Sequence, residues 1–87
     1  MSLTENNNND DQITTEGVVI PVDWNDNGDP ITFAVSTYNE QEYLIDKINR
    51  PGRRVVKHLH RKIWMTGTLG AVVNNRRVMT VKCFKPI

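Results

Sequence analysis

The sequence is poor in residues that cross-link a chain, span a membrane or catalyse a reaction. It has one cysteine, Cys83, so it cannot form an internal disulfide bond. No apolar run approaches the about 20 residues that a membrane-spanning helix needs, and no signal-peptide-like segment precedes the first predicted strand. These absences favour a cytoplasmic protein without membrane contact. No catalytic motif is present, and we expect no catalytic residue, no metal ion and no cofactor.

Each half of the chain also lacks charges of one sign. Residues 1–46 contain no lysine or arginine, and residues 47–87 contain no aspartate or glutamate. The net charge of +1 therefore conceals ten acidic side chains in the first half and eleven basic side chains in the second. This segregation, rather than the sum, is the informative quantity.

The first residues are poor in apolar side chains. Residues 1–12 contain four consecutive asparagines followed by two aspartates, and Leu3 is their only sizeable apolar residue besides Met1. Such a segment cannot bury enough apolar surface to offset the entropy that it loses on ordering. We predict a disordered tail over residues 1–12 and a single domain over residues 13–87.

Five segments have the composition of β-strands. Their β-branched content or alternation of apolar and polar residues predicts strands over residues 13–24, 31–37, 42–45, 63–73 and 77–84. The Asn27-Gly28 pair is typical of a hairpin turn, and Asn74 with Asn75 predicts another. Gly17 and Gly67 lie inside long strands, where a missing side chain permits the bend that closes a small barrel.

The segment between the third and fourth strands has a different period. Val55, Val56 and Leu59 recur at helical spacing, which predicts a helix of about three turns over residues 52–62. Pro51 suits the first turn of such a helix. We expect this basic helix to close one end of the barrel and to expose its cations to solvent, with contact to phosphates as the alternative; the cations are Arg53, Arg54, Lys57 and Arg61.

The predicted order of elements indicates an all-β fold. Three strands, a helix and two strands make the OB-like five-stranded Greek-key β-barrel, with one short α-helix between strands 3 and 4. The stretches EGVVIPVDW, NGDPITFAVST, KIWMTGTL and RRVMTVKCF resemble those of single-domain bacterial OB-fold proteins of uncharacterised function. The resemblance implies a binding module, because OB domains commonly bind single-stranded nucleic acid, oligosaccharides or proteins.

Two groups of residues imitate metal sites. Asp23, Asn25 and Asn27 have the spacing of a calcium-binding loop, but the closing glutamate position is Ala34, so we predict a hairpin turn, with a weak surface cation site as the alternative. His58 and His60 lie two residues apart, and on a helix they would point about 200° away from each other, which one metal ion cannot bridge.

We predict structural roles for the cysteine and for two of the aromatic side chains. Cys83 lies in a strand of alternating character, and we predict a buried structural thiol. Phe33 and Trp64 are assigned to the core, because burying either contributes a large apolar area to a small domain.

The usual ligand surface of an OB fold is formed by strands 2 and 3 with the loops that join strands 1–2 and 4–5. Residues that could bind a ligand there are two arginines and three aromatic side chains: Arg76, Arg77, Trp24, Tyr38 and Tyr43. The loop between strands 1 and 2, however, carries three aspartates that would repel a phosphate backbone; they are Asp23, Asp26 and Asp29.

Two functions follow from these residues. The first is a non-enzymatic OB-fold module that binds a protein partner or a second copy of itself. The alternative is a single-stranded nucleic-acid-binding protein that uses the basic C-terminal half.

The arrangement of the charges in space has two possible forms. If the acidic and basic strands form separate lobes, the domain is an electric dipole whose copies can associate. If they alternate around the barrel, cross-strand pairs neutralise one another. We favour alternation, because strand 1 of a Greek key pairs with strands of both halves.

Overall fold

The structure, a computed structural model, describes residues 12–87. The predicted disordered tail, residues 1–12, lies outside the described residues except for Gln12. Gln12 begins the first strand, where it pairs with Thr68.

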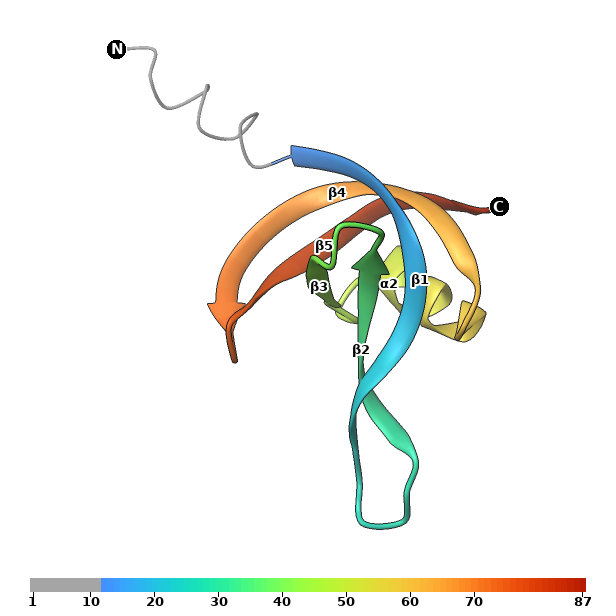
Figure 1. The fold of residues 1–87 in the computed structure, drawn as a ribbon, viewed down its shortest axis with the longest axis vertical. Helices are drawn as coiled ribbons and strands as arrows, with labels where there is room; N and C mark the ends of the chain where they lie inside the picture. The colour runs from blue at the N-terminus through green and yellow to red at the C-terminus, as the bar shows by residue number, and fades with distance from the viewer. Residues whose placement is uncertain (1–11) are drawn as a thin grey trace.

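Five strands form one closed barrel (Figure 1). They are β1 (Gln12–Trp24), β2 (Pro30–Thr37), β3 (Glu42–Ile45), β4 (Lys62–Val73) and β5 (Arg76–Pro86). The order around the ring is β1-β2-β3-β5-β4, and β1 pairs with β4 to close it. All pairs are antiparallel except β3 with β5. The predicted OB-like barrel, with one short α-helix between its third and fourth strands, is confirmed.

The core lies inside the ring and is aliphatic. Its fully buried side chains come from β1, β2, β4, β5 and the helix; the largest are Ile63, Met65, Met79, Val19, Val35, Val55 and Val81. Phe33 is half-buried and packs against this cluster. The assignment of Trp64 to the core was wrong: Trp64 lies between the buried Ile63 and Met65 on β4, so strand alternation turns its half-buried ring outward.

Two glycines permit the curvature of the long strands, as predicted. Gly17 pairs with Thr37 of β2 and with Ile63 of β4, so β1 passes between its two neighbours at this residue. A Cβ atom at Gly17 would lie 2.4 Å from the Ser36 carbonyl oxygen, and one at Gly67 would lie 2.3 Å from the Thr80 carbonyl oxygen. Both positions therefore require glycine for the close approach of the neighbouring backbone.

A register shift in β5 explains why Cys83 is not buried. Thr66 pairs with Cys83, whereas the next residue, Gly67, pairs with Val81, so Lys82 is an extra residue on β5. This β-bulge reverses the alternation of the strand. Val81 therefore points into the core, Cys83 is exposed, and Phe84 packs against the core. The predicted buried thiol was wrong because the sequence pattern does not reveal the bulge.

The helical segment is shorter than predicted. It consists of α2 (Arg50–Val55) and one 3-10 turn, η1 (Val56–His58), instead of a helix over residues 52–62. The chain leaves the helix because residues 59–61 pair with β1. The His60 N–H donates to the Val19 carbonyl at 2.7 Å, and the Val19 N–H donates to the Arg61 carbonyl at 3.1 Å. His60 adopts a φ of 65°, which ends the helical path.

Asn49 attaches the helix to the barrel with both ends of its side-chain amide. The Asn49 Oδ1 accepts from the Gly52 N–H at 3.0 Å and caps α2. The Asn49 Nδ2 donates to the Val81 carbonyl of β5 at 2.8 Å. One residue thus starts the helix and fixes it beside the bulge of β5.

Candidate interaction surfaces

The strand order keeps the two kinds of charge apart in space. β1, β2 and β3 carry no basic residue and are consecutive in the ring, while β4 and β5, which carry no acidic residue, are neighbours. Opposite charges that the strands carry can therefore be neighbours only at two seams, β3 with β5 and β1 with β4. Outside the strands, Lys47 follows β3 and reaches β2, where its Nζ donates to the Ile31 carbonyl at 2.9 Å. The favoured alternation of acidic and basic strands around the barrel was wrong, because strand 1 is the only acidic strand that pairs with β4.

One ion pair joins the two halves within residues 12–87. The Arg76 Nε donates to the Glu42 Oε1 at 2.7 Å across the β3–β5 seam. The loops that follow β2 and β4 meet here in a shallow, polar depression of about 520 Å³. Arg77 is also engaged, since its Nε donates to the Gly70 carbonyl at 2.7 Å. The two arginines of the predicted ligand site thus contact one glutamate and one backbone carbonyl.

The outward face of β2 and β3 does not resemble a nucleic-acid groove. Cross-strand pairing aligns an apolar row on it, formed by Ile20, Ala34, Leu44 and Val78, of which Ala34 and Leu44 are buried. Tyr43 points to the other side of β3 and packs against the core, so it is not an exposed stacking platform. Tyr38 is 97% exposed, but it lies in the loop after β2.

The β1–β2 hairpin extends away from the barrel and from α2 (Figure 1). The Asn25 Oδ1 accepts from the N–H groups of Asn27 and Asp29, which forms the predicted turn and occupies the oxygen that a calcium ion would need. The tip exposes three carboxylates beside an apolar ring, because Trp24 is 51% exposed and its neighbours include Asp23, Asp26 and Asp29. This hairpin tip, residues 23–29, is a protruding acidic surface.

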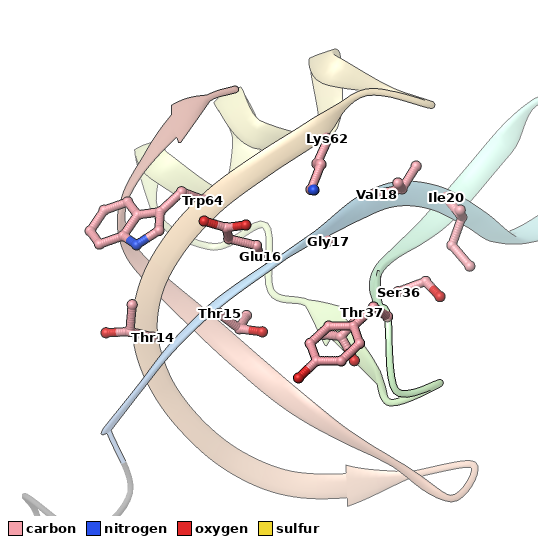
Figure 2. Close-up of a pocket in the computed structure, with 11 residues that line it drawn as sticks. Thr14, Thr15, Glu16, Gly17, Val18, Ile20, Ser36, Thr37, Lys62 and Trp64 are labelled. Carbon is pink, nitrogen blue, oxygen red and sulfur yellow. The ribbon is translucent and has the colours of Figure 1, made fainter.

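A depression of about 830 Å³ lies on the outer side of β1 between β4 and the end of β2 (Figure 2). Its lining includes hydroxyl groups of Thr14, Thr15 and Ser36. Glu16 and Lys62 also line the space between β1 and β4, without forming an ion pair. The depression is open to solvent and has no nucleophile positioned beside a base, so we assign no reaction to it.

A smaller hollow separates α2 from the end of β5. It has a volume of about 210 Å³, and we call it the α2–β5 notch; it is lined by Arg50, Pro51, Arg54, Lys82, Cys83 and Phe84. Its three cations come from two elements, since Arg50 and Arg54 lie one turn apart on α2 and Lys82 is the bulge residue of β5. None of the three forms an ion pair within the described chain.

The other basic residues near the helix differ in their hydrogen bonding. The Arg53 side chain is held in place, because its guanidinium donates hydrogen bonds to the Ile48 and Lys47 carbonyls. Lys57 and Arg61 are exposed and do not line the notch. Of the four cations predicted to form a solvated helix face, only Arg54 therefore belongs to the notch.

Sequence reasoning missed Arg50, Lys82 and Phe84 as members of one site. Arg50 and Arg54 have a helical spacing that could have paired them. Lys82 and Phe84 reach the notch only because of the β5 bulge, for which the strand pattern contains no signal.

Aromatic rings lie beside three further basic side chains, the first of which is Lys47, whose Nζ lies 5.3 Å from the centre of the Phe33 ring. Lys85 Nζ lies 5.9 Å from the centre of the outward-facing Trp64 ring, a cation–π arrangement. His58 meets Phe84 edge to face, with ring centres 5.4 Å apart.

Within residues 12–87, no three His, Cys, Asp or Glu side chains converge as metal ligands. No helix in this part of the chain is long and apolar enough to cross a membrane. Comparison with protein-family models, curated proteins and solved structures gives no match.

Proposed function

We propose that the protein is a non-catalytic interaction module that binds a second copy of itself through faces of opposite charge. The observation that carries this proposal is the strand order, which gathers β1–β3 on one side and β4, β5 and α2 on the other. A surface divided in this way attracts its own copies in a preferred orientation, because the acidic face of one molecule approaches the basic face of another.

One detail supports self-association over neutralisation within one molecule, and a second argues against a nucleic-acid groove on β2 and β3. Only the Glu42–Arg76 pair joins the halves in the described part of the chain, so most charges have no intramolecular partner. The row that Ala34 and Leu44 form on β2 and β3 is buried, so it presents none of the exposed rings and cations that a nucleic-acid binder would need.

Sedimentation velocity over a concentration series tests this proposal. The expected result is concentration-dependent association in about 0.01 M salt that weakens strongly in about 1 M salt, since the Debye length falls from roughly 30 Å to 3 Å. A monomer at every concentration in low salt would overturn the proposal. Association that is equally strong in both salts would also contradict it, because it would not be electrostatic.

The alternative function is single-stranded nucleic-acid binding by the basic half. The observation that favours it is the Lys85–Trp64 pair, because a cation beside an outward-facing ring can bind a phosphate while the ring stacks on a base. Fluorescence anisotropy with a labelled oligothymidine tests it. Binding at about 50 mM salt that falls steeply towards about 200 mM salt supports nucleic-acid recognition. Lack of binding at about 50 mM salt rules it out.

Substitutions separate the two candidate nucleic-acid surfaces. If the usual OB surface binds the strand, R76A/R77A weakens binding and W64A does not. If the β4–β5 outer face binds it, W64A weakens binding and R76A/R77A has little effect, because Arg76 and Arg77 already contact Glu42 and Gly70.

A further inference from the structure

We infer that the α2–β5 notch is a receptor for carboxylates, and that its occupant is the β1–β2 hairpin tip of a second copy. The inference rests on the proposed self-association and assigns its contact residues. In the contact, Asp26 and Asp29 of one copy face the notch cations of the other, and Trp24 packs beside them.

The notch has the chemistry that carboxylates require. Arg50, Arg54 and Lys82 converge on one hollow, and none is neutralised by an ion pair within residues 12–87. Arginine presents a planar fork of donors that matches a carboxylate, and two arginines one turn apart can bind two such groups. The aliphatic and aromatic parts of Pro51 and Phe84 give the same hollow an apolar lining.

The hairpin tip has the complementary chemistry and shape. It carries carboxylates and no cation, and Trp24 supplies an exposed apolar ring of the type that often anchors protein interfaces. An indole can pack on an arginine guanidinium, so the apolar and the charged contacts reinforce each other. The tip protrudes while the notch is concave, which allows insertion.

The contact joins two molecules rather than two parts of one. Figure 1 shows the hairpin extending away from the barrel, with its tip far from α2. The paired strands β1 and β2 hold the tip in that position. A tip can therefore reach a notch only on another copy, and each molecule presents one of each.

The charge of the tip can be reversed by substitution without removing its turn. The turn depends on the Asn25 side chain and on backbone groups of Asp29, so the side chains of Asp26 and Asp29 are not needed for it. The charge of the notch can be reversed at Arg50 and Arg54, because both side chains are exposed and make no hydrogen bond that holds the helix.

The test measures self-association of D26K/D29K, of R50E/R54E and of their equimolar mixture in low salt. Each variant alone should bind itself at least about tenfold more weakly than the wild type, because like charges then face each other. The mixture should recover association, since the wild-type tip fits the wild-type notch and the lysine tip fits the glutamate notch. Far-UV circular dichroism establishes that both variants are folded.

K57E/R61E is the matched control, because it changes the net charge by the same amount as R50E/R54E at exposed positions outside the notch. It should retain most of the wild-type association. A loss equal to that of R50E/R54E would show that overall charge, not the notch, controls assembly, and would overturn the inference.

The remaining outcomes distinguish the two proposals. Wild-type association that R50E/R54E leaves unchanged would overturn the notch as the contact while the proposed function stands. A wild-type monomer would overturn both. Loss of oligothymidine binding in R50E/R54E, with unchanged self-association, would assign the notch to phosphates and would also overturn the inference.

Discussion

Glu42 and Arg76 connect the acidic and basic halves of the barrel, with the Arg76 Nε donating to the Glu42 Oε1 at 2.7 Å. About a third of each side chain is exposed, at 34% for Arg76 and 32% for Glu42, so water screens the pair. We expect E42Q to lower the free energy of unfolding by less than about 1 kcal/mol. Urea denaturation of E42Q, R76Q and the double variant measures the coupling. A coupling above about 2 kcal/mol would show that the seam is electrostatically stronger than its exposure suggests.

Asn49 makes two separable contributions to stability. N49S keeps an oxygen that can cap α2 but is too short to reach the Val81 carbonyl, so it should cost about 1 kcal/mol. N49A loses the cap as well and should cost about 2 kcal/mol. Urea denaturation measures both values. Equal losses in the two variants would mean that the cap contributes nothing.

Gly17 should not tolerate a methyl group. A Cβ atom there would lie 2.4 Å from the Ser36 carbonyl oxygen, so the backbone of β2 would have to move. We expect G17A to destabilise the protein by about 1–3 kcal/mol. G70A is the matched control, because its added Cβ would meet only the Val78 carbonyl oxygen at 3.7 Å. Thermal unfolding compares the two, and a G70A loss as large as that of G17A would contradict the steric explanation.

The exposed position of Cys83 predicts rapid modification in the native state. A thiol reagent such as a nitrobenzoate disulfide should react completely without denaturant, since the side chain is accessible. C83S should change the free energy of unfolding by less than about 0.5 kcal/mol, as is usual for exposed positions. Reaction that requires denaturant would place the thiol inside, as strand alternation alone predicted.

Strand composition and turn chemistry were sufficient to predict the fold. The apolar alternation of β2, the Asn-Gly turn and the two bend glycines are local signals, and each agrees with the barrel. The extent of the helix was not predictable in the same way. The spacing of Val55, Val56 and Leu59 favours continued helix, but hydrogen bonds between residues 59–61 and Val19 outweigh that local preference.

The candidate contact surfaces were predictable only in part. The charge segregation is visible in the sequence, yet its arrangement in space depends on the ring order, which local patterns do not determine. Arg54 could be named from the sequence as part of a basic helix. Its neighbours Lys82 and Phe84 could not, because the bulge in β5 and the attachment of α2 by Asn49 bring them together.

The closure of the ring by β1 and β4 has a consequence for folding kinetics. Residues 12–18 pair with residues 62–68, so the long loop between these segments must close before their hydrogen bonds can form. Pairings between distant segments slow folding, because loop-closure entropy is lost before the contacts compensate it. We therefore expect ring closure, rather than formation of the short α2, to set the folding rate. Of the two bend glycines, Gly17 sits where that late pairing meets the earlier β1–β2 hairpin.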